Sequence, residues 1–186
     1  MDSRNNKKII FMGLAIAINL VGGFIALTLK LPIYIDTIGT ILVSILFGPI
    51  SGAMVGGLSS IFNAVTFDPI SFYFMPVQII VGLSTGMLFK KQKFKGVKSV
   101  ISIILVTILG SAAAAVIASF VFEGVTSSGS SILVAILKNS GISIITSVFS
   151  TQIFTDLLDK AISFGVVFTI IKMLPVNIKS MAIGEK

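Results

Sequence analysis

The chain has 186 residues, of which 55% are hydrophobic and only 11% are charged, and its formal net charge is +7. Soluble domains usually carry about a quarter charged residues, so this composition predicts an integral membrane protein. The sequence contains no cysteine and no histidine. It therefore excludes disulfides and thiolate metal sites, and it lacks the commonest general base and metal ligand.

The first apolar run follows the basic segment MDSRNNKK and covers about residues 9–29. This run is longer than the apolar core of about 7 to 15 residues that is typical of a secretory signal. We therefore expect a retained first transmembrane helix. Further apolar runs lie at about 37–51, 52–67, 72–89, 99–122 and 153–174, which brings the expected number of crossings to six.

Two parts of this pattern are irregular. The second and third runs are short for a bilayer with a hydrocarbon core of about 30 Å, and glycines and prolines crowd their junction. The stretch 131–150 is apolar but is broken by Lys138, Asn139 and Gly141, so we expect a partly inserted helix packed on the bundle. The predicted fold is an all-α membrane bundle that forms a single domain over 1–186.

The basic residues predict the orientation of the bundle. Most of them form three clusters beside apolar runs: Arg4, Lys7 and Lys8; Lys90, Lys91, Lys93, Lys95 and Lys98; and Lys172, Lys179 and Lys186. With six crossings all three clusters fall on one side, which the positive-inside rule makes cytoplasmic. Both termini are then cytoplasmic. A positive charge arranged in this way reflects membrane topology, and we do not expect nucleic acid as a partner.

Polar side chains gather near the predicted external ends of the helices. Buried polar groups are costly in a membrane and usually face a bundle interior or a wet cavity. We expect a pocket open to the outside, in which aromatic rings supply contact area and a few polar groups fix orientation. The predicted ligand-binding residues are Asp36, Asn63, Asp68, Phe72, Tyr73, Gln78, Lys138, Asn139, Gln152, Asp156, Asp159 and Lys160, and the loop aromatics Tyr34, Phe67 and Phe74 lie near them.

These residues also allow a purely structural interpretation. Asp156 or Asp159 can pair with Lys160, and Asp36 can pair with Lys30, without any ligand. The aromatic residues can form an interfacial belt. Catalysis finds little support, because no histidine, cysteine or GxSxG motif accompanies the acidic residues. No P-loop is present either, so we expect no bound cofactor, and any dependence on ATP requires another chain.

Small residues mark one face of the first helix. Gly13 and Ala17 are four residues apart, and Gly22 and Gly23 follow. Small residues at this spacing allow another helix to approach closely. The face is expected either to pack within the bundle or to dock a membrane partner.

Two stretches resemble the substrate-binding S component of energy-coupling factor (ECF) vitamin transporters. ILFGPISGAMVGGLSSIFNAV (45–65) is similar to the GP-x-x-G-x-x-x-G turn between the family's second and third helices. PVQIIVGLSTGMLFKK (76–91) is similar to its fourth helix, which ends in G-x-x-x-G and basic residues. The length and the six expected crossings also fit, so the resemblance covers nearly the whole chain.

The resemblance implies a six-helix subunit that captures a vitamin or a related precursor outside the cell and delivers it inward. It implies partners as well, namely a transmembrane coupling subunit and two ATPase subunits in the lipid bilayer of a bacterial plasma membrane. The family's Ala-x-x-x-Ala docking motif corresponds best to Gly13 and Ala17. Its ligand site, near the external ends of helices four to six, coincides with the polar constellation described above.

The substrate is left open by the sequence. Lys138 and Lys160 favour a carboxylate or a phosphate on the ligand, while the aspartates favour an amine, so the charges alone do not decide. Two other functions also remain open. One is a membrane sensor or adaptor, although no signalling domain is evident, and the other is a self-sufficient secondary transporter, although no internal repeat is visible.

Overall fold

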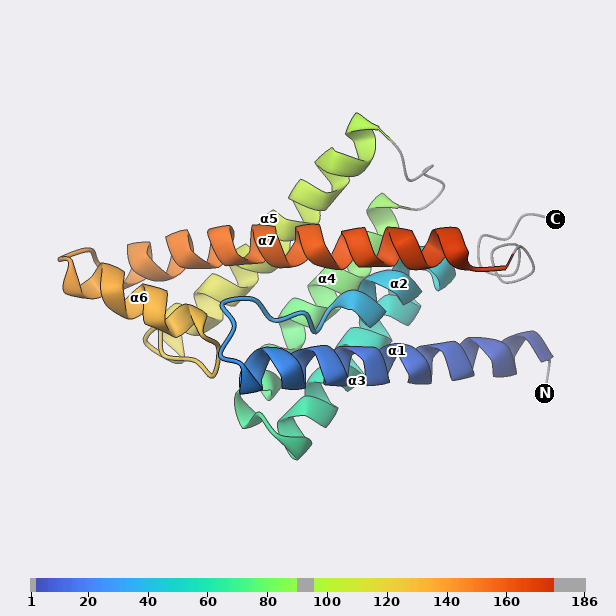
Figure 1. The fold of residues 1–186 in the computed structure, drawn as a ribbon, viewed down its shortest axis with the longest axis horizontal. Coiled ribbons are helices and arrows are strands. Elements are labelled where there is room, and N and C mark those ends of the chain that lie inside the picture. Colours follow the sequence, from blue (N-terminus) through green and yellow to red (C-terminus); the bar gives the residue numbers. More distant parts are fainter. Residues whose placement is uncertain (1–2, 90–95, 176–186) are drawn as a thin grey trace.

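The computed structural model describes residues 3–89 and 96–175, and this part of the chain is all helical, without β-strands. Seven α-helices and one short 3-10 helix follow one another (Figure 1). They are α1 (Ser3–Thr28), α2 (Ile38–Phe47), α3 (Pro49–Thr66), η1 (Pro69–Phe72), α4 (Met75–Leu88), α5 (Val97–Phe120), α6 (Ser130–Asn139) and α7 (Ile144–Met173). The all-α prediction is confirmed for these residues, whereas the six crossings stay a prediction.

The last helix differs most from its predicted range of 153–174. Helix α7 begins at Ile144 and has 30 residues, so its first turns occupy sequence that was assigned to a partly inserted helix over 131–150. That predicted helix is wrong in extent, because α6 ends at Asn139 and Gly141 has a φ of +86°. Glycine adopts this conformation without steric cost and so permits the turn. The Ser143 hydroxyl then caps α7 by accepting from the Thr146 N–H at 3.2 Å.

The other predicted boundaries are shifted by a few residues. The break between the second and third helices falls at Gly48, which has a φ of +90°, rather than at residue 51. Pro49 follows at the first position of α3, where its missing N–H costs nothing. The stretch before α4 forms η1, so α4 begins at Met75 instead of residue 72, while α1 begins at Ser3 instead of residue 9.

Helix α7 has a buried face that is mostly polar as far as Ser163 and apolar beyond it, and an exposed face that is largely apolar. Gln152, Asp156 and Asp159 are among its buried residues, whereas Phe154 and Leu157 are exposed. This arrangement is the reverse of that in a soluble protein, whose helices bury their apolar face. It is what a helix needs when its outer face contacts lipid and its inner face lines a polar interior.

Within residues 3–89 and 96–175, two helices are long and apolar enough to cross a membrane by length and composition. These are the 24-residue segments Asn5–Thr28 and Val97–Phe120, with mean hydropathies of 2.4 and 2.6. The outer surface of α1 is apolar along its length, with Ile10, Leu14 and Val21 exposed. The composition and these surfaces together indicate a membrane location.

Helices α3 and α4 pack against each other more extensively than any other described pair. Glycines make this close approach possible. A Cβ on Gly56 of α3 would lie 2.6 Å from the carbonyl oxygen of Gln78, and a Cβ on Gly82 of α4 would lie 2.6 Å from the backbone nitrogen of Ala53. Because backbone atoms cannot move aside as a flexible side chain can, larger residues would force the two helices apart.

The beginning of α1 and the end of α7 lie at the same end of the molecule (Figure 1). An apolar core that includes Phe89, Phe164 and Ile171 fills the bundle toward this end. Residues 90–95 and 176–186 lie outside the described part of the chain, and they contain most of the basic residues from which the orientation was predicted. The cytoplasmic position of the termini therefore stays a prediction.

Candidate ligand-binding site

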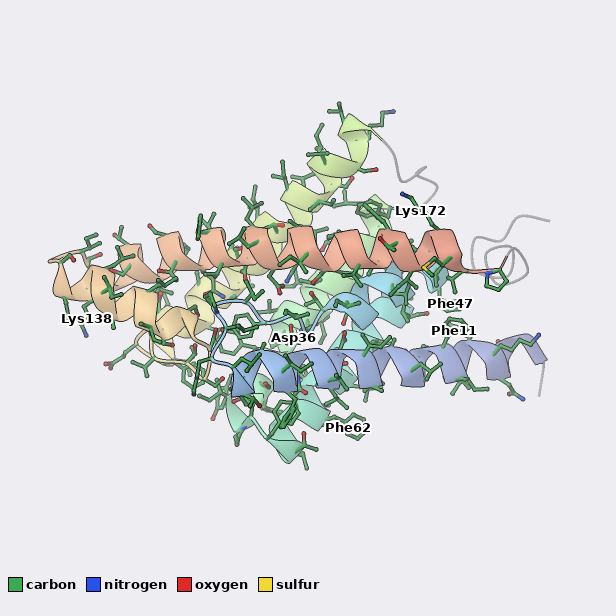
Figure 2. All side chains as sticks on the ribbon, in the orientation of Figure 1. Phe11, Asp36, Phe47, Phe62, Lys138 and Lys172 are labelled. Atoms are coloured by element: carbon green, nitrogen blue, oxygen red, sulfur yellow. The ribbon has the colours of Figure 1, made fainter. Side chains whose placement is uncertain are left out.

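A cavity with an empty volume of about 600 Å³, which includes space open to solvent, lies between the helices. Residues from α3, α4, α5 and α7 and from the connections α1–α2, α3–α4 (with η1) and α5–α6 line it. Asp36, which Figure 2 shows in the middle of the molecule between α1 and α7, is one of its walls. The lining residues are Tyr34, Asp36, Thr37, Ser60, Asp68, Ile70, Ser71, Phe74, Val77, Gln78, Gly110, Ala114, Ser127, Gln152, Asp156 and Lys160. Polar and apolar side chains from separate elements converge on this partly open space, as they do in small-molecule sites.

The connection between α1 and α2 forms one wall of the cavity through Tyr34 and Asp36. Between them Ile35 has a φ of +51°, a left-handed conformation that is strained for a β-branched residue. Its N–H donates to Asp159 Oδ1 at 2.7 Å, and this bond ties the connection to α7. Gly22 of α1 lets the connection approach, because a Cβ there would collide with the Ile35 carbonyl.

Burial perturbs both ionisable groups of this connection. It raises the pKa of the Asp36 carboxyl from its ordinary 3.8 to about 6; the Asp159 carboxylate adds to the rise, and Lys160 opposes it. Burial also raises the pKa of the Tyr34 hydroxyl, whereas hydrogen bonding with Ser128 and other hydroxyl groups lowers it by a smaller amount. In both cases the loss of water disfavours the charged form.

A hydrogen-bond network fixes Gln78 in the cavity wall. Asn19 of α1 is fully buried, and its amide donates to the hydroxyls of Thr40 at 2.9 Å and Ser59 at 3.0 Å. Its Oδ1 accepts from the Gly39 N–H at 2.6 Å, in the first turn of α2. The Thr40 hydroxyl donates to Gln78 Oε1 at 3.2 Å, and the Gln78 amide donates to the Asp36 carbonyl oxygen at 3.3 Å. The network thus links α1, α2, α3 and α4 to the cavity.

Asp68 joins two loops beside the cavity. Its Oδ2 accepts from the Ser71 hydroxyl at 2.8 Å and from the Ser127 hydroxyl at 2.9 Å. Ser127 belongs to the loop between α5 and α6, whereas Asp68 and Ser71 belong to the connection between α3 and α4. The carboxylate therefore holds these two loops together.

Helix α7 contributes a cluster of charged side chains to the site. Lys160 Nζ bonds Asp159 Oδ2 at 2.6 Å, and both side chains are buried. Asp156 Oδ2 accepts from the Ser111 hydroxyl of α5 at 2.8 Å. Gln152 is only 5% exposed and lines the cavity, yet its amide has no hydrogen-bond partner among the described residues. This amide is available to a ligand.

A second, smaller cavity of about 330 Å³ shares the wall formed by Tyr34, Asp36, Asp68, Ser71 and Ser127, and it lies toward α1. Asn63 lines this second cavity, is 3% exposed, and has an Oδ1 without a hydrogen-bond partner in the described part of the chain.

Some of the predicted binding residues line the main cavity, and others lie near it or far from it. Asp36, Asp68, Gln78, Gln152, Asp156 and Lys160 line the main cavity, whereas Asn63 lines the second one and Asp159 lies behind Lys160. Phe72 and Tyr73 are 53% and 54% exposed and line neither cavity. Lys138 and Asn139 are exposed at the end of α6, and Figure 2 shows Lys138 far from Asp36. That these groups bind a ligand stays a prediction.

Several lining residues carried no clear signal in the sequence. Ser127 lies in the stretch GVTSSGSS, whose composition indicates flexibility, yet Asp68 fixes it. Gly110 and Ala114 of α5 are part of an apolar run, and only the fold shows that their small size leaves room for the cavity. Phe74 was noted only as a loop aromatic, but it occupies the position expected for Phe72 and Tyr73.

Gly13 and Ala17 lie on the exposed side of α1. A Cβ on Gly13 would meet no atom within 4 Å, so internal packing does not require glycine there. The alternative interpretation of this pair, close packing inside the bundle, is therefore wrong for Gly13. The buried positions on the other side of the helix are Ala15, Asn19 and Ala26.

A comparison with protein families gives a match that covers most of the chain. The family model of the ECF transporter, substrate-specific component, matches residues 7–171. No curated protein and no solved structure matches the chain significantly. The matched range includes every residue that lines the two cavities.

Proposed function

Because the chain belongs to the family of ECF transporter substrate-specific components, we propose that it captures a water-soluble vitamin or a related precursor outside the cell and delivers it inward. The family resemblance seen in the sequence is confirmed. Members of this family are substrate-specific transport subunits rather than enzymes, and they associate with an ECF module in a membrane. The vitamin-like cargo and the composition of that module, one coupling subunit and two ATPases, are part of the proposal.

The main cavity carries the proposal. Its walls combine apolar surface from Phe74 and Val77 with the polar side chain of Gln78, which hydrogen bonds hold in place, and with the amide of Gln152, which faces the cavity. This is the usual division of labour in small-molecule sites, in which apolar area supplies affinity and a few polar groups supply orientation. We therefore place the substrate in this cavity.

We further propose that α1, α2, α3, α4, α5 and α7 provide the six crossings. Helix α2 has 10 residues and spans only about 15 Å, so α2 and α3 cross as short segments joined at Gly48. The cavity then opens toward the outside through the three loops that contain Tyr34, Asp68 and Ser127. The termini lie on the cytoplasmic side of a bacterial plasma membrane.

We assign the exposed side of α1 to the coupling subunit. Gly13 and Ala17 are exposed there among apolar residues, and they are the positions that best match the family's docking motif. Small residues let two membrane helices approach closely. A larger side chain would hold a partner helix away without touching the cavity.

Reconstituted transport tests the function. The protein is placed in liposomes with or without the coupling subunit and ATPases. Uptake of labelled vitamins is measured with and without ATP on the side of the membrane that the ATPases face. We expect uptake only with both the module and ATP. Uptake by the chain alone would indicate a secondary transporter instead, and binding without uptake in the complete system would indicate a sensor or adaptor.

Gln78→Leu provides the variant for this assay. The change removes the polar groups that bond Thr40 and Asp36 and leaves an apolar side chain that is one bond shorter. We expect weaker substrate binding and reduced uptake with normal insertion. Ile145→Leu, an exposed apolar change on α7, is the matched control and should transport normally.

A further inference from the structure

We propose that the main cavity takes a small organic cation built on a flat ring, such as a heteroaromatic amine or a quaternary heteroaromatic ion. The inference rests on the proposed function, because it names the class of substrate for the same site. It goes beyond the prediction from sequence, in which the lysines favoured an anionic ligand and the aspartates favoured an amine. The structure shows how those charges are distributed.

The lysines do not supply a free positive charge. Lys160 lines the cavity, but its ammonium is held by Asp159 at 2.6 Å. Asp159 is fully buried and does not line the cavity, so the pair is satisfied within the protein. Lys138, the other candidate for binding an anion, is exposed at the end of α6 (Figure 2). An anionic ligand would therefore have to compete with Asp159 for Lys160.

The carboxylates, in contrast, exceed the positive charge. Asp36, Asp68 and Asp156 line the cavity, and none of them forms an ion pair among the described residues. Asp68 and Asp156 accept hydrogen bonds from serine hydroxyls, which carry no charge. Negative charge buried in a membrane bundle is costly when it is not compensated. A positive charge on the ligand provides that compensation.

A second observation points independently to a ligand. Gln152 is 95% buried, lines the cavity and has no protein partner in the described part of the chain. Its amide faces the cavity instead of a protein partner, so its donor and acceptor are open to a ligand. It stands one helical turn before Asp156, on the same buried face of α7. A ligand whose ring substituent hydrogen-bonds the Gln152 amide and whose positive charge lies near Asp156 would satisfy both side chains.

The cavity favours an organic cation over a metal ion. No three acidic side chains of the described residues gather closely enough to hold a metal. The lining instead includes the aromatic rings of Tyr34 and Phe74 and the small residues Gly110 and Ala114. Aromatic faces attract cations, and the small residues leave room for a ring.

The test compares ligands that differ mainly in charge. Thermal shifts and equilibrium binding are measured at neutral pH on the full chain in detergent. The probes are thiamine and 1-methylnicotinamide as cations, nicotinamide and riboflavin as neutral molecules, and nicotinate and biotin as anions. We expect at least one cation to bind, and 1-methylnicotinamide to bind more tightly than either nicotinamide or nicotinate.

Three variants identify the groups responsible. Asp156→Asn and Asp36→Asn should each weaken the binding of the cation about tenfold or more, since each removes one member of a buried charge pair. Glu123→Gln makes the same change in charge on an exposed loop outside both cavities and should leave binding unchanged. Melting temperatures without ligand show that each variant is folded.

The outcomes separate this inference from the proposed function. Binding of only neutral or anionic probes, lost in Ala114→Leu, would overturn the cation and leave the cavity as the binding site. Cation binding that is equal in wild type, Asp156→Asn and Asp36→Asn would also overturn the inference. No binding of any probe would overturn the inference and count against the proposed vitamin-binding function.

Discussion

Replacing Asn19 by leucine tests how α1 is connected to the cavity wall. The fully buried amide makes three hydrogen bonds, to Gly39 N–H at 2.6 Å, Thr40 Oγ1 at 2.9 Å and Ser59 Oγ at 3.0 Å. Leucine has a similar branched shape but a larger volume and no polar atom, so the bonds are lost without leaving a cavity. The Gly39 N–H in the first turn of α2 is then left without its acceptor.

The expected cost follows from these contacts. A buried donor left without a partner costs about 1 to 3 kcal/mol. The two hydroxyls lose a donor but can rotate, and hydrogen bonds between membrane helices average about 0.6 kcal/mol each. We therefore expect Asn19→Leu to lower the free energy of unfolding by about 2 to 4 kcal/mol.

Gln152→Leu is the matched control for this change. Gln152 is also a buried amide, but it has no partner in the described part of the chain, so its replacement breaks no bond within the protein. Unfolding of both variants is followed by circular dichroism during titration with denaturing detergent. We expect Asn19→Leu to unfold earlier than wild type, and Gln152→Leu to unfold at the wild-type midpoint or later while binding its substrate less well. Equal destabilisation by the two variants would refute the reasoning.

Three further predictions address packing, docking and pH. Gly82→Leu should destabilise the protein, because a Cβ at this position would already lie 2.6 Å from the Ala53 nitrogen, and an unchanged melting temperature would contradict the close contact of α3 and α4. Gly13→Leu and Ala17→Leu should bind substrate normally but assemble poorly with the coupling subunit in pull-down assays; normal assembly of both would place the docking face elsewhere. The raised pKa of Asp36, about 6, means that the folded state holds this proton more tightly than the unfolded chain. Stability should therefore fall by up to ~3 kcal/mol as the pH rises from about 4 to about 6 and stay low above it. If the melting temperatures of wild type and Asp36→Asn change equally with pH across this range, the shift in pKa is contradicted.

The sequence predicted the helices well because the apolar runs are long and the breaks are marked by glycine and proline. Its main error was the beginning of α7. Ser147, Thr151 and Thr155 are polar residues at helical spacing, and they all lie on the buried face of this helix. In the sequence, the stretch 131–150 was interpreted as a separate, partly inserted helix broken by Lys138, Asn139 and Gly141, so its last residues were not joined to the apolar run that begins at 153. A polar face turned inward reveals itself only when the neighbouring helices are known.

The site was predicted in part for a related reason. The spacing of Gln152, Asp156 and Lys160 on one helix face was readable from the sequence, and all three line the cavity. The role of Asn19 was not readable, because its three partners lie on α2 and α3, 20 to 40 residues further along the chain. Nor could the sequence show that Lys138 points away from the site. Helix periodicity sets which residues share a face, but the packing of helices sets which faces meet.

The central claim, that the main cavity holds the transported molecule, is tested most directly by identifying what the purified protein carries. Wild type and Ala114→Leu, whose larger side chain takes up part of the cavity, are denatured, and the released small molecules are quantified by mass spectrometry against a control from membranes without the protein. We predict that one heteroaromatic molecule is enriched close to one per wild-type chain and is missing from the variant. A wild-type protein that carries no such molecule, or a variant that carries as much of it, would contradict the claim.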